Sequence, residues 1–207
     1  MPIKESSDEF NPPAATGPAI SVAPGNKTAG DYLALAIATC GVGYIPLAPG
    51  TWGSAVGIVL YLLLRCGTLK LVHSFVGVNS VLLYDPGIIF VALELVVITA
   101  VTLIGIWAAS VAERIFQKKD PGKVVIDEVA GQLIALLPVP LWAIGPWPWL
   151  ILIAFLLFRA FDIIKPYPVR RLEGLQSGLG IVLDDVAAGA YAAVLVALAS
   201  VLIHGPF

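Results

Sequence analysis

The sequence predicts an all-α fold, namely a multi-pass helical membrane protein with about four to five membrane-embedded helices and a Gly/Pro-rich loop. Of its 207 residues, 58% are hydrophobic and only 13% are charged, and the mean hydropathy is +0.92. This balance lies outside that of soluble domains. The apolar residues gather in long uncharged runs, which suit helices that cross about 30 Å of hydrocarbon at about 1.5 Å per residue.

The chain is expected to divide into a tail and one embedded domain. Residues 1–30 are rich in Pro, Ser, Gly and Ala and lack the apolar segment of a signal peptide. We therefore expect a disordered N-terminal tail, followed by a membrane-embedded domain over residues 31–207. The formal net charge of -2, without a concentrated basic face, argues against nucleic-acid binding and leaves lipids or small anions as expected partners.

Glycine and proline divide the first uncharged run, which extends from Tyr32 to Leu64. A single helix does not tolerate this density of helix-breaking residues in its middle. We therefore expect a short helix near Asp31–Cys40, a loop over Gly41–Gly53 and a helix from about Ser54 towards Cys66.

Three further apolar runs complete the expected bundle. Ile88–Ala112 is long enough to span the membrane, and Val186–Ile203 is the last expected span. Val129–Phe158 contains four prolines, so it should fold as two helices joined by a turn at Leu137–Trp149. Residues Gly67–Gly87 are expected to form a connection.

Two pairs of adjacent carboxylates, Asp127-Glu128 and Asp184-Asp185, each precede a long uncharged run. A charge at mid-membrane costs roughly 2.5–3.5 kcal/mol on insertion scales unless it is paired, hydrated or metal-bound. We expect each pair at a helix N-terminus, where one acid would cap free N–H groups. The second acid would point about 100° away, and oxygen-only ligands of this kind suit Mg²⁺. Capping and metal binding both remain open at this point.

Basic and hydroxyl side chains supply candidate phosphate contacts. Arg159, Asp162 and Lys165 recur at spacing three and share one face of a helix end. Arg159 follows an apolar run directly, and its planar guanidinium suits bidentate phosphate binding; a structural salt bridge to Asp162 is the alternative. The Gly/Pro-rich loop leads into a helix through Thr51 and Ser54, where a phosphate could sit on free N–H groups.

Alternating helices would bring the acidic pairs, Arg159 and the Gly/Pro-rich loop to one membrane face. Only Arg65 and Lys70 fall on the opposite side. The positive-inside rule therefore predicts that the motif face is cytoplasmic, and Arg170 and Arg171 are expected to be interfacial anchors for anionic headgroups. The basic residues on the motif side are Lys4, Lys27, Arg114, Lys118, Lys119, Lys123, Arg159, Lys165, Arg170 and Arg171.

The sequence lacks the motifs of phosphatases that use a cysteine or histidine nucleophile. Neither cysteine begins a Cys-x5-Arg signature, and neither His73 nor His204 lies near the acidic pairs in the sequence. What remains is metal-assisted attack by water, with one carboxylate acting as base. The alternative is an ion-coupled membrane transporter that uses the carboxylates as a relay, because the two acidic stretches echo each other like a repeat. The expected position of the acids at one membrane face, away from the midplane, argues against a transporter.

Four motifs in this order resemble those of the phosphatidylglycerophosphatase A family. They are Pro49–Ser54, Asp120 with Ile126–Gly131, Phe158–Pro168 and Gly180–Gly189. The resemblance implies an Mg²⁺-dependent phospholipid phosphatase, a phosphoric monoester hydrolase that converts phosphatidylglycerophosphate to phosphatidylglycerol and phosphate. It also implies a multi-pass protein of the bacterial inner membrane whose active site faces the cytoplasm.

The family's functional residues carry over onto matching positions of this chain. The resemblance implies catalytic roles for Asp127, Glu128, Asp162, Asp184 and Asp185. Four of these, Asp127, Glu128, Asp184 and Asp185, are implied metal ligands. Substrate binding is implied for Arg159, Lys165, Thr51 and Ser54. The oligomeric state, the number of metal ions and the identity of the base are left open.

Overall fold

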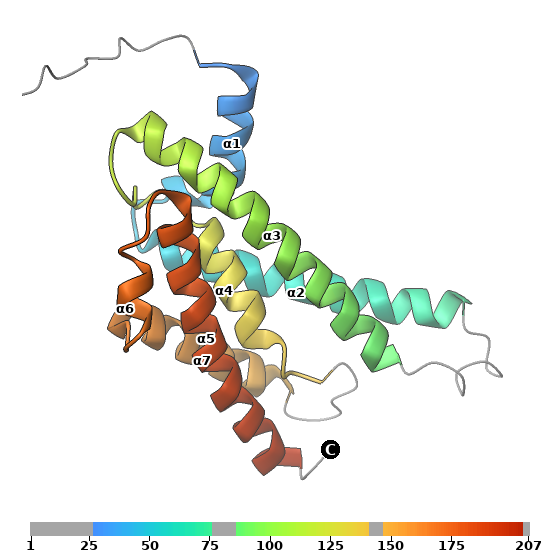
Figure 1. Ribbon diagram of the computed structural model, residues 1–207. Helices are drawn as coiled ribbons and strands as arrows, with labels where there is room; N and C mark the ends of the chain where they lie inside the picture. Colours follow the sequence, from blue (N-terminus) through green and yellow to red (C-terminus); the bar gives the residue numbers. More distant parts are fainter. Residues whose placement is uncertain (1–26, 76–85, 141–146, 205–207) are drawn as a thin grey trace, which may run out of the picture.

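The computed structural model describes residues 27–75, 86–140 and 147–204, and within these ranges it is all-helical, which confirms the predicted fold class (Figure 1). Most of the predicted tail and the centre of the predicted turn after Leu137 lie outside the described residues. The elements in order are α1 (Ala29–Thr39), the 3-10 turn η1 (Val42–Tyr44), α2 (Pro49–Phe75), α3 (Pro86–Phe116), α4 (Ile126–Leu136), α5 (Trp147–Ile164), α6 (Val169–Leu172) and α7 (Gly178–His204).

Helices α1 and α2 are joined by a shorter loop than predicted. The α1 helix ends at Thr39, the following Cys40 adopts a left-handed conformation with φ 47°, and Gly41 continues the turn with φ 71°. The α2 helix already begins at Pro49, because proline needs no intrahelical partner in a first turn. It also continues past Gly67 to Phe75, since one glycine costs a helix only about 1 kcal/mol. The predicted limits of this helix, Ser54 and Cys66, are therefore wrong.

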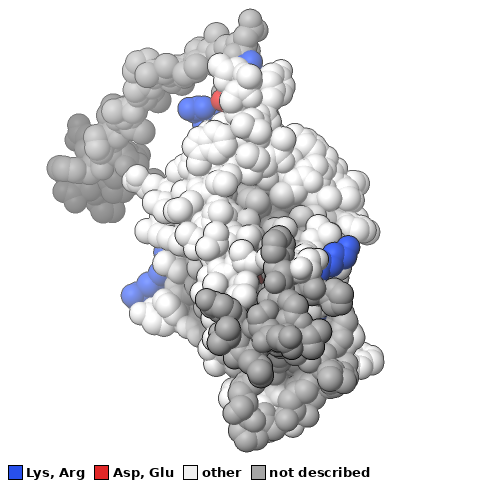
Figure 2. Space-filling view, turned by 90° about the vertical axis from the view of Figure 1, so that its right-hand side faces the viewer, with Lys and Arg blue, Asp and Glu red and all other residues white. Residues whose placement is uncertain are grey.

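Three described helices are long and apolar enough to cross a membrane: Pro49–Leu71, Gly87–Phe116 and Gly178–Leu202. The predicted count of about four to five membrane-embedded helices is not confirmed. Large apolar side chains on these helices are exposed, for example Val96, Leu103 and Leu202. One face of the molecule shows charged side chains at only a few points of its described surface (Figure 2). Such an apolar exterior suits a membrane protein.

The short helix α4 lies at the centre of the bundle and packs against α2, α3, α5 and α7 (Figure 1). All of its residues except Glu128 and Ile134 are buried. Gly131 of α4 and Gly189 of α7 face each other, and a Cβ on Gly189 would collide with the Gly131 carbonyl oxygen. The two backbones can therefore approach closely, as small residues permit in membrane helix pairs.

The C-terminal end of α4 is held by polar side chains of α2. The Tyr61 hydroxyl donates to the Val139 carbonyl oxygen at 3.2 Å, and Arg65 Nη1 donates to the Pro140 carbonyl oxygen at 2.7 Å. Backbone groups at a helix end need such partners when water is excluded. Near this end, Glu94 of α3 is completely buried, and neither of its carboxylate oxygens has a hydrogen-bond partner among the described residues.

The two acidic pairs occupy different positions in their helices. Asp127 and Glu128 lie in the first turn of α4, as predicted. Asp184 and Asp185 do not lie at a helix N-terminus, because α7 already begins at Gly178 and places them well inside the helix. The Gly178 N–H donates to Ser110 Oγ of α3 at 3.1 Å, which provides a partner for the start of α7.

Candidate active site

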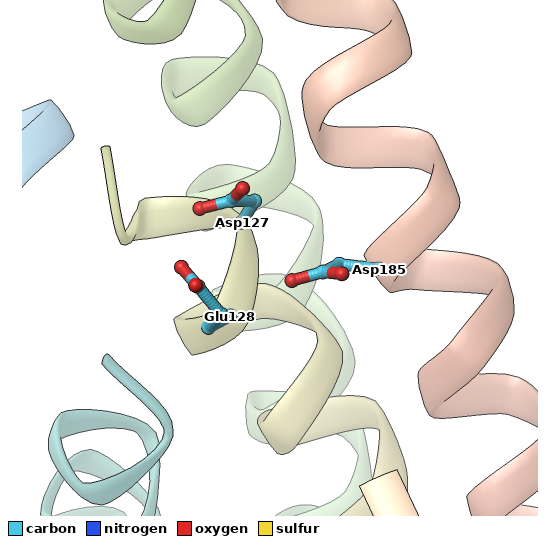
Figure 3. Close-up of side chains that lie close together, drawn as sticks. All are labelled: Asp127, Glu128 and Asp185. Atoms are coloured by element: carbon cyan, nitrogen blue, oxygen red, sulfur yellow. The ribbon is translucent and has the colours of Figure 1, made fainter. Parts of the chain in front are cut away.

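Three carboxylates from two helices converge at the start of α4. Asp127 and Glu128 come from α4 and Asp185 from α7, and their side chains point toward one another (Figure 3). One oxygen from each lies within 4.8 Å of the others. The backbone approach at Gly131 and Gly189 brings Asp185 to α4, and the Val125 N–H, which donates to the Ala38 carbonyl oxygen at 2.8 Å, ties the start of α4 to α1.

Each carboxylate of this triad has one buried oxygen without a hydrogen-bond partner among the described residues. Asp127 is 8% exposed and Asp185 only 3%. Asp127 Oδ1, Glu128 Oε2 and Asp185 Oδ2 are buried without a hydrogen-bond partner among the described residues. Burial raises the pKa of Asp127 to about 6, and burial together with the charge of Asp127 raises the pKa of Glu128 well above its usual range. Unpaired buried oxygens of this kind are expensive, and a hard divalent cation such as Mg²⁺ would compensate them.

Asp184 is engaged in an ion pair outside the triad. Its Oδ2 accepts a hydrogen bond from Lys165 Nζ at 2.7 Å, and the same ammonium lies 3.5 Å from Glu173 Oε1. Burial alone would lower the pKa of Lys165, but the hydrogen bond and charge of Asp184 outweigh it and raise that pKa. Lys165 therefore stays charged across the physiological range. The metal-ligand role of Asp184 stays a prediction.

Arg159 and Asp162 lie one turn apart on α5 and form an ion pair, which was the predicted alternative to phosphate binding by Arg159. Arg159 Nη1 lies 2.8 Å from Asp162 Oδ2, but Nη1 makes no hydrogen bond of good geometry within the described part of the chain. Gly50 of α2 packs against the same guanidinium, since a Cβ there would lie 2.9 Å from Arg159 Nη1 and would collide with Glu128 Oε1. Glycine at this position lets the start of α2 approach both Glu128 and Arg159.

These groups line one cavity of about 740 Å³. The cavity thus unites four segments that are far apart in the sequence. Thr51 and Ser54 do not line it: Thr51 is exposed, and the buried Ser54 hydroxyl donates to the Gly50 carbonyl oxygen at 3.0 Å. Their role as phosphate contacts stays a prediction. The charged lining residues are Lys119, Asp120, Asp127, Glu128, Arg159, Asp162, Lys165, Arg170, Glu173, Asp184 and Asp185.

Sequence reasoning did not place Lys119, Arg170 or Glu173 at the site. All three lie outside the long helices, in the segments that follow α3 and α5, and this position is the only signal that the sequence offers for them. Their neighbours Lys118 and Arg171 carry the same signal and do not line the cavity. Only the direction of the side chain distinguishes the lining residues from these neighbours, and that direction depends on tertiary packing.

The match to a family model decides what kind of protein carries this cavity. The model describes phosphatidylglycerophosphatase A and covers residues 35–200. The chain belongs to the phosphatidylglycerophosphatase A family. The predicted family is thereby confirmed, and with it an enzyme of the phosphoric monoester hydrolase class. The transporter alternative finds no support.

Named relatives agree on phosphatase chemistry. A phosphatidylglycerophosphatase A of Haemophilus influenzae is 38% identical over 75% of this chain and 81% of the relative. Its counterpart from Escherichia coli is 28% identical over 74% of each chain. A Bacteroides thetaiotaomicron protein, named provisionally as a phosphatidylinositol-3-phosphatase, is 37% identical over 77% of this chain and 87% of its own length. No solved structure matches the chain.

The phosphatidylglycerophosphatase A match covers all four segments of the cavity. It includes the start of α2, the carboxylates of α4, the basic end of α5 and the acidic pair of α7. The triad, Arg159 and Lys165 therefore lie within the residues that the family model matches, whereas residues 1–34 lie outside the match.

Proposed function

We propose that this protein is an Mg²⁺-dependent phosphatase that hydrolyses phosphatidylglycerophosphate to phosphatidylglycerol and phosphate at the cytoplasmic face of the bacterial inner membrane. One observation carries the proposal: three carboxylates, each with a buried oxygen that has no hydrogen-bond partner among the described residues, share a cavity with Arg159 and Lys165. The triad suits a hard divalent cation, and the two basic side chains suit a phosphate.

Each group has a role in this proposal. Asp127, Glu128 and Asp185 hold the cation, which when bound stabilises negative charge on the phosphoryl oxygens. Arg159, which lines the cavity, binds the terminal phosphate through its planar guanidinium, and Lys165 adds a second charge.

The remaining carboxylates orient the two basic side chains, and one carboxylate of the cavity acts as the base for the attacking water. Asp162 holds Arg159 at 2.8 Å, and Asp184 holds Lys165 at 2.7 Å, so both cations are positioned before the substrate arrives. One cavity carboxylate accepts the proton of the water that attacks phosphorus, as general base catalysis requires. The P–O bond to the glycerol headgroup breaks as the bond to water forms, and the leaving primary alkoxide takes up a proton to become the hydroxyl of phosphatidylglycerol.

The substrate class follows from the relatives. Phosphatidylglycerophosphate and phosphatidylinositol 3-phosphate are both phospholipids with one phosphodiester and one phosphomonoester, and only the monoester is cleaved by such enzymes. We favour phosphatidylglycerophosphate because the family model and two of the relatives carry that name. The cytoplasmic orientation is supported by the excess of Lys and Arg at the cavity end of the helices.

A phosphate-release assay in detergent micelles tests the proposal. The purified full chain should release phosphate from phosphatidylglycerophosphate with Mg²⁺ and lose this activity in EDTA. Glu128→Gln should lower kcat at least about 10²-fold, since it removes a ligand charge worth several kcal/mol. Glu113→Gln is the matched control, because Glu113 does not line the cavity. Full activity in EDTA would refute the metal mechanism, and faster turnover of phosphatidylinositol 3-phosphate would refute the preferred substrate.

A further inference from the structure

The cations that line the cavity fall into two groups. Arg159 and Lys165 are each held by a carboxylate, at 2.8 Å and 2.7 Å. Lys119 and Arg170 also line the cavity, yet their side chains form no ion pair or hydrogen bond within the part of the chain that the structure describes. Two exposed positive charges therefore border a cavity whose other charged side chains are mostly carboxylates.

Lys119 and Arg170 reach the cavity from different elements. Lys119 lies in the link between α3 and α4, and Arg170 lies on α6. Each has a basic neighbour in the sequence that does not line the cavity. The guanidinium of Arg171 lies over the Tyr167 ring at 4.7 Å and donates to the Tyr167 hydroxyl at 3.1 Å. Only one side chain of each basic pair is thus directed to the cavity.

We infer that Lys119 and Arg170 form a second anion subsite, which binds the phosphodiester of the lipid headgroup while the triad, Arg159 and Lys165 hold the terminal phosphate. The inference rests on the proposed function, which requires a headgroup with two phosphates. It also assigns Arg170 a role other than the interfacial anchor expected from the sequence.

The charge balance of the cavity favours this assignment. A phosphodiester keeps one negative charge, and the surrounding carboxylates would repel it unless cations lay nearby. Arg159 and Lys165 already share their charge with Asp162 and Asp184. Lys119 and Arg170 have no such carboxylate partner among the described residues, so their charge is available to a ligand. A guanidinium and an ammonium together suit one phosphate group.

Steady-state kinetics of the full chain in micelles of uncharged detergent, at saturating Mg²⁺, test the subsite. We compare Lys119→Gln and Arg170→Gln with the matched neighbours Lys118→Gln and Arg171→Gln. Loss of one charged phosphate contact should raise KM for phosphatidylglycerophosphate about tenfold. The inhibition constant of inorganic phosphate, which fills only the terminal site, should not change, and kcat should stay within about twofold of the unaltered protein.

Each contrary result has a distinct meaning. An unchanged KM in both cavity variants would overturn the subsite while leaving the phosphatase intact. Equal increases in Lys118→Gln and Arg171→Gln would overturn it in favour of general attraction to an anionic surface. A parallel rise in the inhibition constant of phosphate would assign the two cations to the terminal site. If the unaltered protein released no phosphate from phosphatidylglycerophosphate, the proposed function would fall and the subsite with it.

Discussion

The close approach of α4 and α7 makes Gly189→Ala the most informative single substitution. A Cβ at this position would lie 3.0 Å from both the carbonyl carbon and the Cα of Gly131, whereas ordinary contacts are 3.4–4 Å, and it would collide with the carbonyl oxygen. Because these are backbone atoms of a packed helix, no side-chain rotation can relieve the contact. The helices must separate by about 0.5–1 Å, at a cost of roughly 1–3 kcal/mol.

Separation of the helices would also open the triad. Asp127 and Glu128 move with α4 and Asp185 with α7, so their oxygens, which now lie within 4.8 Å of one another, move apart. A misplacement of about 1 Å in a catalytic constellation lowers the rate by up to about 10²-fold. We therefore expect kcat to fall about 10- to 100-fold and Mg²⁺ affinity to fall with it.

Phosphate release, Mg²⁺ titration and thermal unfolding measure these effects together. Gly67→Ala is the matched control, because an added Cβ on Gly67 would meet nothing within 4 Å. Alanine is the better helix former by about 1 kcal/mol, so this control should keep its activity and show an equal or higher melting temperature. Gly189→Ala with the melting temperature, kcat and Mg²⁺ affinity of the unaltered protein would refute the link between helix approach and triad geometry.

Three further predictions concern single groups. Mg²⁺ affinity should fall as the pH drops from about 7.5 to about 5.5, because metal binding needs ionised carboxylates and burial raises the pKa of Asp127 to about 6; calorimetric titration that gave equal affinities would contradict this. Gly50→Ala should lower kcat about tenfold or more, since its Cβ would collide with Glu128 Oε1 and press on the Arg159 guanidinium, and phosphate release compared with Gly67→Ala measures the loss. Glu94→Gln should raise the free energy of unfolding by about 1 kcal/mol without changing kcat, because it replaces a buried carboxylate that has no hydrogen-bond partner among the described residues; a lower melting temperature would argue against this.

The sequence was sufficient for the fold class, the family and the convergence of the motifs. Long uncharged runs predicted the helices, and the polar ends of those runs predicted that Asp127, Arg159 and Asp184 would meet. These inferences held because hydropathy and chain direction constrain a membrane bundle strongly.

Features that depend on neighbouring helices could not be predicted in the same way. The start of α7 at Gly178 is supported by a hydrogen bond to Ser110, which belongs to a distant helix. Two glycines and a serine around that point read as a loop when the sequence is taken alone. Likewise, Lys119 cannot be told from Lys118 by composition, because only packing decides which of the two lines the cavity.

The short length of α4 has a consequence for how the protein is assembled. Its 11 residues extend about 16 Å, roughly half the hydrocarbon thickness, so α4 cannot insert into a bilayer as an independent span. The carbonyl groups that follow it depend on Tyr61 and Arg65 of α2, and lipid offers no substitute for these donors. The helix that carries Asp127 and Glu128 therefore depends on α2 for its position, and these two carboxylates can reach their place in the cavity only once α2 has been inserted.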